Sequence, residues 1–120
     1  MSTVLIIEDN PRNLKLVRDV LNFKGFPTLE ADNAEDGLAI AVAAHPDLVL
    51  LDIQLPGIDG VEALSRLRAD PRTADIPVMA VTAFAMQSDR ERLKAAGFDA
   101  CLEKPIDVRR LPETVAELLR

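Results

Sequence analysis

The amino-acid sequence predicts an α/β fold, a (βα)5 chain that forms a doubly wound, five-stranded parallel sheet. Five short runs rich in Val, Ile and Leu alternate with five longer stretches of helical character, and the connections between them are short. Most of these runs are apolar throughout rather than at every second residue, which is typical of strands buried on both faces. Right-handed crossovers then place helices on both sides of the sheet.

Strands are expected where the apolar runs are bounded by turn-forming residues. Their ranges are 3–7, 27–31, 47–51, 76–82 and 99–103. The third run, "DLVLL", is the most apolar and leads directly into Asp52. We therefore expect Asp52 at the end of a central strand.

Helices are expected at 10–25, 33–45, 60–70, 86–97 and 107–120. The first has clear end signals: Asn10 suits the N-cap, Pro11 suits the first helical position, and Gly25 suits the stop. Leu14, Val17 and Leu21 recur at helical spacing, so they predict its buried face.

The last helix carries Pro112 near its start, which removes a backbone donor there. We expect the regular helix to begin late, around residues 109–111, with Asp107 as a cap or turn before it. Three phenylalanines are expected in or near the core: Phe23, Phe26 and Phe98.

The length and the net charge of the chain exclude several classes of function. The 120 residues fit a single domain, 1–120. The net charge of −6 argues against direct binding to nucleic acid or an anionic membrane, because no basic face is available. The chain has one cysteine, no basic leader before its first apolar run and no apolar segment of about 20 residues. These features predict a cytoplasmic protein.

Polar side chains stand where the expected strands end. Glu8 and Asp9 follow the first strand, Asp52 follows the third, Thr82 ends the fourth, and Lys104 follows the fifth. In an open parallel sheet the functional site lies beyond the carboxyl ends of the strands. We therefore expect these five side chains to converge on one edge.

Three neighbouring carboxylates predict a cation site. At about 5 Å and an effective dielectric near 20, each pair repels by roughly 3 kcal/mol. Without help, one acid would be pushed toward its protonated form. Mg²⁺ suits hard oxygen ligands in a small, partly wet site and also accepts phosphate oxygens.

Thr82 and Lys104 are not explained by a cation alone, because an ammonium group repels a metal ion. Both fit an anion, since a phosphoryl group takes hydrogen bonds from a hydroxyl and a point charge from lysine. Carboxylates can accept phosphoryl groups. Asp52 is the best placed nucleophile.

Taken in order, these residues resemble a response-regulator receiver domain of two-component signalling over the whole chain. The matching stretches are Glu8-Asp9, "LLDIQLPGIDG" around Asp52, "VTAFA" after Thr82, and Lys104-Pro105. The stretches "DIQLPGIDG" and "IPVMAVTAFAM" further resemble stand-alone cell-cycle receivers and the receiver modules of hybrid kinases. The resemblance implies a flavodoxin-like strand order, 2-1-3-4-5.

The resemblance also implies a role for each site residue. Asp52 accepts phosphate from a phosphohistidine. Asp9, Asp52 and the backbone carbonyl of Gln54 ligate Mg²⁺, and Glu8 helps through water. Thr82 hydrogen-bonds the phosphoryl group and Lys104 pairs with it. The bond between Lys104 and Pro105 is commonly cis in the family.

One position departs from the family pattern. Three residues before the lysine, where the family usually has an aromatic switch residue, this chain has Cys101, and it contains no Tyr or Trp. The inward swing of a ring cannot occur here. Phe84 is close in sequence and is a candidate substitute. Cys101 itself reads as a small strand residue rather than a redox sensor.

The expected function is a phosphorylation-dependent signalling switch rather than an enzyme. The partners implied are a histidine kinase or histidine phosphotransfer protein, docking through Asn10, Asn13, Leu14 and the loops around Pro56 and Pro105, and a downstream protein. The downstream protein would meet the face formed by the fourth helix, fifth strand and fifth helix. No output domain follows within the sequence.

Two alternatives stand beside this reading. One is a small Mg²⁺-dependent phosphatase with an aspartyl nucleophile, but its usual second acid two residues later is replaced by Gln54. The other is a receiver that serves as a scaffold without phosphorylation, for which Cys101 leaves some room.

Overall fold

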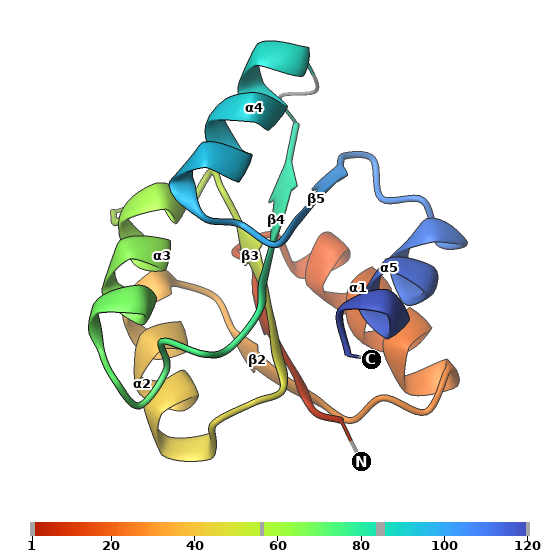
Figure 1. Ribbon diagram of the computed structural model, residues 1–120. Coiled ribbons are helices and arrows are strands. Elements are labelled where there is room, and N and C mark those ends of the chain that lie inside the picture. The colour runs from red at the N-terminus through yellow and green to blue at the C-terminus, as the bar shows by residue number, and fades with distance from the viewer. Residues whose placement is uncertain (1, 56, 84–85, 120) are drawn as a thin grey trace.

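The computed structural model describes residues 2–55, 57–83 and 86–119. Its strands are β1 (Val4–Ile7), β2 (Thr28–Ala31), β3 (Leu48–Asp52), β4 (Val78–Thr82) and β5 (Ala100–Glu103). Its helices are α1 (Pro11–Phe23), α2 (Ala34–Ala44), α3 (Gly60–Ala69), α4 (Gln87–Ala96) and α5 (Arg110–Leu118). All strand pairs are parallel, and their order is β2-β1-β3-β4-β5 (Figure 1). The expected fold and strand order are confirmed.

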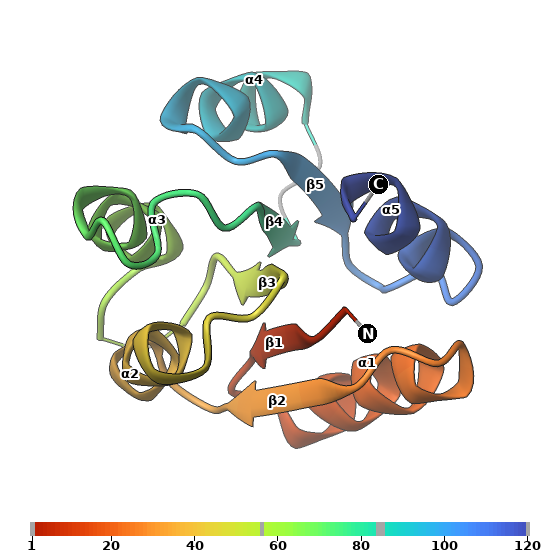
Figure 2. The same cartoon turned by 60° about the horizontal axis from the view of Figure 1, so that its bottom comes forward.

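The sheet separates two hydrophobic cores. Successive strand residues point to opposite faces, so Leu5 and Ile7 pack on one side, and Val4 and Ile6 on the other. The first side is covered by α2, α3 and α4, and the second by α1 and α5 (Figure 2). The middle strands are buried on both faces, which explains their unbroken apolar sequences.

The helix ends follow local sequence signals. Asn10 Oδ1 accepts hydrogen bonds from the backbone N–H groups of Arg12 at 2.9 Å and Asn13 at 3.2 Å, so Asn10 caps α1 as expected. Gly25 follows α1 with a φ of +90°, which glycine adopts without strain. Helix α5 begins at Arg110, inside the expected range. The carboxylate of Asp107 accepts hydrogen bonds from the backbone N–H groups of Arg109 and Arg110, where the helix starts.

The expectation for Phe23 is wrong. Its side chain is 84% exposed, whereas Phe98 is buried and Phe26 packs partly buried against the core. Phe23 lies two residues beyond Leu21, which rotates it about 200° around the helix, away from the sheet. An aromatic side chain at this position therefore lies on the surface.

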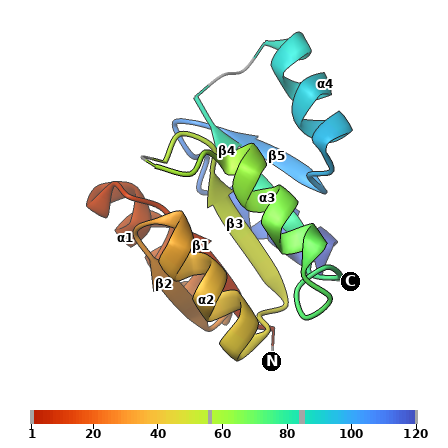
Figure 3. The same ribbon diagram turned by 90° about the vertical axis from the view of Figure 1, so that its left-hand side faces the viewer.

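Helix α4 buries fewer residues than any other helix. Leu93 is its only buried residue, and no side chain caps its first turn. Arg90 forms an ion pair with Glu103 of β5. Figure 3 shows α4 at the far end of the sheet from β2.

Two expected features lie outside the described residues: Pro56, in the predicted docking loop, and Phe84, the candidate substitute for the aromatic switch. Gly57, next to Pro56, has a φ of +82°, as a turn requires. Among the described residues, no helix combines the length and the apolar character needed to cross a membrane.

Candidate functional site

Three carboxylates meet at the carboxyl ends of two central strands. Strands β1 and β3 are paired, with Ile7 opposite Leu51, so the residues that follow these two are neighbours. One carboxylate oxygen from each of Glu8, Asp9 and Asp52 lies within 4.8 Å of the others. Glu8 and Asp52 are only 4% and 2% exposed, while Asp9 is exposed at the rim. The expected acidic cluster is therefore present.

Lys104 contributes a cation directly to this cluster. Its Nζ donates a 2.9 Å hydrogen bond to Asp52 Oδ2 and lies 3.5 Å from Glu8 Oε1. Its backbone N–H donates to the carbonyl oxygen of Thr82 at 2.8 Å, which fixes the lysine at the end of β5. The bond between Lys104 and Pro105 is cis, as the family resemblance implied.

The two buried acids differ in protonation. Burial raises the pKa of Glu8 to about 7, and its hydrogen bond with Asp52 acts in the same direction. Burial also opposes ionisation of Asp52, but hydrogen bonds from Glu8, the Gln54 N–H and Lys104 outweigh it and lower the pKa of Asp52. One acid is thus pushed toward its protonated form, and this acid is Glu8, with burial as the main cause and the charge of Asp52 as a smaller one.

The loop after β3 is fixed to the Asp52 side chain. The backbone N–H of Gln54 donates to Asp52 Oδ1 at 2.9 Å. The N–H of Gly60 donates to the carbonyl oxygen of Ile53 at 3.2 Å, and a Cβ on Gly60 would lie 2.7 Å from Ile53 Cα. Only glycine permits this approach. Sequence reasoning missed Gly60, although "GIDG" contained the signal.

Thr82 lies on the strand next to Asp52. Asp52 is opposite Val81 in the β3–β4 register, and Thr82 is the next residue along β4. Thr82 is fully buried. Thr82 therefore lies at the same edge of the sheet as the three acids and Lys104.

Cys101 lies on β5 opposite Ala80 and packs, partly buried, against the core under α2, α3 and α4. Burial raises the pKa of its thiol, although the charge of Arg90 acts in the opposite direction. A thiol with a raised pKa is a poor nucleophile at neutral pH. This supports the reading of Cys101 as a packing residue.

The cluster has the chemistry of a magnesium site. It offers hard carboxylate oxygens within one small space, and repulsion from the charge of Asp52 adds to burial in raising the pKa of Glu8. A divalent cation among them would offset that repulsion. The donor set therefore fits Mg²⁺.

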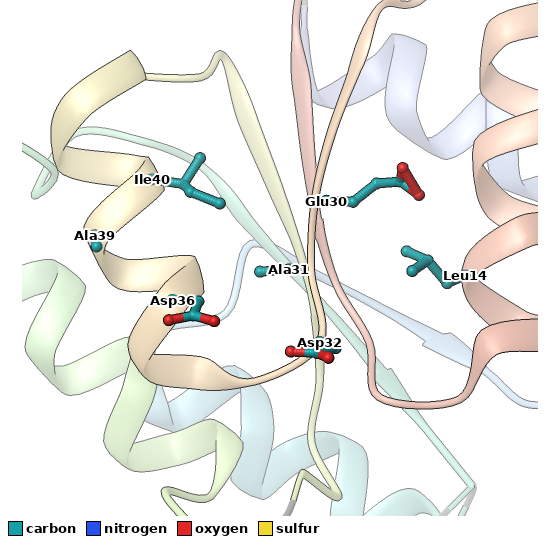
Figure 4. Close-up of a pocket in the computed structure, with 7 residues that line it drawn as sticks. All are labelled: Leu14, Glu30, Ala31, Asp32, Asp36, Ala39 and Ile40. Carbon is teal, nitrogen blue, oxygen red and sulfur yellow. The ribbon is translucent and has the colours of Figure 1, made fainter.

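A separate groove of about 480 Å³ lies over the edge strand and is not this site. Leu14 and Glu30 line it on the α1 side, and Asp36 and Ile40 on the α2 side (Figure 4). None of the residues expected at the phosphoacceptor site lines it. The acidic side chains and Lys104 lie at the carboxyl ends of the strands instead.

With this fold and this site, the chain belongs to the response regulator receiver domain family, which its sequence matches over residues 4–116. Receiver domains are phosphorylation-dependent signalling switches, and this chain is one of them. The family match does not favour the phosphatase alternative. The resemblance seen in the sequence is confirmed.

Similar curated proteins are polar-differentiation response regulators called DivK. The protein from Brucella ovis is 44% identical over 117 residues, which cover 98% of this chain and 95% of the relative. The protein from Brucella melitensis has the same identity and coverage. The similarity to stand-alone receivers thus extends along nearly the whole length of both proteins.

Solved structures agree with the fold. A response regulator from Chloroflexus aurantiacus superposes with a TM-score of 0.93 at 30% identity, covering 98% of this chain and 97% of the other. The receiver domain of a sensor histidine kinase from Pseudomonas aeruginosa has a TM-score of 0.90 at 29% identity and the same coverage. That structure has a magnesium ion coordinated in its active-site cleft.

Proposed function

We propose that Asp52 is the phosphoacceptor of this receiver domain. The observation that carries this proposal is the set of contacts made by its carboxylate. Oδ2 accepts a hydrogen bond from Lys104 Nζ, Oδ1 accepts one from the backbone N–H of Gln54, and Glu8 contacts the same carboxylate from the end of β1. These contacts keep Asp52 ionised, as a nucleophile must be. In the transfer, the phosphorus–nitrogen bond of a phosphohistidine breaks and a bond from phosphorus to an Asp52 oxygen forms.

The roles of the other residues follow from their charges. Asp9 and Asp52 would hold Mg²⁺ together with the backbone carbonyl of Gln54, and Glu8 would assist through water. When bound, the cation neutralises negative charge on phosphoryl oxygens. Lys104 would exchange part of its contact with Asp52 for the phosphoryl group, and Thr82 would donate its hydroxyl to it. Each of these side chains already lies at the same edge.

Receiver domains interact with histidine kinases or phosphotransfer proteins. For this chain we place the donor over the first turn of α1, at Asn10, Asn13 and Leu14, beside the loops around Pro56 and Pro105. Asn10 is exposed and Leu14 is partly exposed, so they are accessible to a partner. The net charge of −6 makes nucleic acid and anionic membrane poor partners.

The downstream face is proposed at α4, β5 and α5. The weak attachment of α4 supports this choice, because one buried leucine and one ion pair hold it. With Cys101 in place of a ring, the shift would pass from Thr82 into the segment that precedes α4. We further propose that residues 1–120 act as one cytoplasmic receiver domain that has no enzymatic turnover on other substrates.

Phosphorylation tests the assignment of Asp52. The purified protein is incubated with Mg²⁺ and a small-molecule phosphodonor, and intact mass and peptide mapping follow the added phosphoryl group. We expect one group on Asp52 and none in Asp52→Asn. The matched control is Asp59→Asn, which removes an exposed acid that caps α3 and should leave labelling unchanged. Equal labelling of Asp52→Asn would contradict the assignment.

Binding of a phosphate mimic tests the proposed switch. Amide NMR spectra are compared with Mg²⁺ before and after beryllofluoride, since the chain lacks Trp and Tyr as fluorescent reporters. Shifts that extend through α4 to β5 are expected. Shifts restricted to the residues around Asp52 would show that the site binds the mimic without moving α4.

A further inference from the structure

The surface formed by the end of α1 and the segment that leads into α5 exposes two large apolar side chains close together. Phe23 is 84% exposed and Val108 is 48% exposed. Two open hollows of about 360 and 510 Å³ adjoin there and share Lys24 and Val108 in their linings. We propose that this surface, the Phe23 patch (Asp19, Phe23, Lys24, Val108, Arg109 and Glu113), pairs with the same patch of a second copy of the chain.

The apolar part of the patch is suited to an interface centre. An exposed aromatic ring next to a hollow can enter the matching hollow of a partner, and buried aromatic anchors carry much of the energy of protein interfaces. The larger hollow is lined partly by Phe26, Pro112 and Ala116, so a ring would meet apolar atoms there. Helices α1 and α5 lie side by side and give this surface a rigid base (Figure 2).

The charges of the patch identify a second copy as the occupant. The patch contains two cations, Lys24 and Arg109, and two carboxylates, Asp19 and Glu113. It is neutral in a chain of net charge −6, so two copies can approach there without repulsion between the patches themselves. The proposed two-fold arrangement pairs each cation with a carboxylate of the other copy. A purely acidic or purely basic partner would oppose half of these charges.

The existing contacts of the patch do not prevent this pairing. Asp19 accepts a 2.7 Å hydrogen bond from Lys15 and lies 3.5 Å from Arg18, but Asp19 and Lys15 are both more than half exposed. An exposed pair of this kind contributes little and exchanges easily. The ammonium of Lys24 lies 5.9 Å from the centre of the Phe23 ring, so a cation is already positioned at the edge of the apolar centre.

The pairing goes beyond the phosphoacceptor proposal and is independent of it. The patch lies at the last turn of α1, and none of its residues belongs to the acidic cluster at the strand ends. Asp52→Asn should therefore pair as the unmodified chain does. The phosphorylation test and the pairing test can fail separately.

Analytical ultracentrifugation over a range of protein concentrations tests the pairing. We expect a reversible dimer, and an increase of about tenfold or more in its dissociation constant for Phe23→Ser. The matched control is Val61→Ser on α3, another exposed apolar residue, which should leave the dissociation constant unchanged. A chain that stays monomeric up to about 1 mM, or a Phe23→Ser variant that dimerises equally well, would overturn the proposal.

Charge exchange tests the occupant directly. A variant with Lys24→Glu and Arg109→Glu has an acidic patch, and one with Asp19→Lys and Glu113→Lys has a basic patch. Each alone should lose self-association, and a mixture of the two should form a heterodimer. Failure of the mixture to pair would refute the self-complementary arrangement. Circular dichroism and phosphorylation at Asp52 verify that each variant is folded.

Discussion

The acidic centre at the strand ends and helix α4 differ in how firmly the rest of the molecule holds them. At the centre, Glu8 and Asp52 are almost fully buried and bound to each other, to Lys104 and to backbone N–H groups. Helix α4 has one buried residue, no side-chain cap and an ion pair to β5. This difference shows that phosphoryl transfer needs side chains in fixed positions, whereas signalling to a partner needs an element that a small free energy can move.

The proposed switch depends on this difference. Phosphorylation replaces the single negative charge of the Asp52 carboxylate with a phosphoryl group that carries about two, so the centre gains about one negative charge. A ligand or modification shifts an equilibrium only by its differential interaction with the two states, typically a few kcal/mol. This is enough to change the position of a weakly held helix but not that of β3, which is buried along its whole length.

Two leucines measure the contrast directly. Leu51 in β3 and Leu93 in α4 are both about fully buried. We expect Leu51→Ala to lower the free energy of unfolding by about 4 to 5 kcal/mol, because the packed sheet cannot collapse around the cavity. Leu93→Ala should cost only about 2 to 3 kcal/mol, because α4 can relax. Chemical denaturation measures both, and equal costs would remove the basis of the comparison.

Lys104 tests how far the centre depends on its cation. Lys104→Met keeps the length of the side chain but leaves Asp52 buried without its charged partner. We expect a loss of about 3 kcal/mol of stability without Mg²⁺, and a smaller loss with it. Lys94→Met, an exposed lysine on α4, is the control and should change stability by less than about 0.5 kcal/mol. A stable Lys104→Met variant in chelator would show that the pair is unimportant.

Glu8 should make the stability of the metal-free protein depend on pH. Its pKa is raised from 4.5 to about 7, so between these values the folded chain keeps a proton that the unfolded chain loses. Stability therefore falls as pH rises through this window. The pKa difference sets a ceiling of about 3 kcal/mol, and Asp52 adds no slope in this window, because its lowered pKa leaves it ionised in both the folded and the unfolded chain.

In Glu8→Gln the side chain is uncharged at every pH, so the free energy of unfolding should no longer fall between pH 4.5 and 7. Denaturation in chelator from pH 4.5 to 8 measures it, with the exposed Glu35→Gln as control. Added Mg²⁺ should restore stability to the unmodified chain at pH 8. A Glu8→Gln variant with the same pH slope as the parent would assign the slope to another group.

Much of this arrangement could be predicted from the sequence because each signal is local. Asn10 and Gly25 mark the ends of α1, and the unbroken apolar strands require cover on both faces. Parallel strands then bring their carboxyl ends together, which gathers Glu8, Asp52 and Lys104 without knowledge of any contact.

The rest depends on distances that a pattern does not contain. Sequence could state that one acid should be protonated but not that burial selects Glu8. The need for glycine at residue 60 arises from its approach to Ile53, a tertiary contact. Phe23 was misplaced because an aromatic residue suggests a core, while its rotation from Leu21 directs it outward.

The smallest expected effect comes from the ion pair that ties α4 to β5. Arg90 and Glu103 are both about half exposed, so Arg90→Ala should cost only about 0.5 kcal/mol and leave global unfolding almost unchanged. Because so little else holds α4, the same loss should increase amide hydrogen exchange in this helix about twofold. Arg92→Ala is the matched control, since Arg92 pairs with Asp89 inside α4 and does not reach β5. If both variants exchange alike, the tie to β5 has no special part in holding α4, and Leu93 alone sets how easily the helix moves.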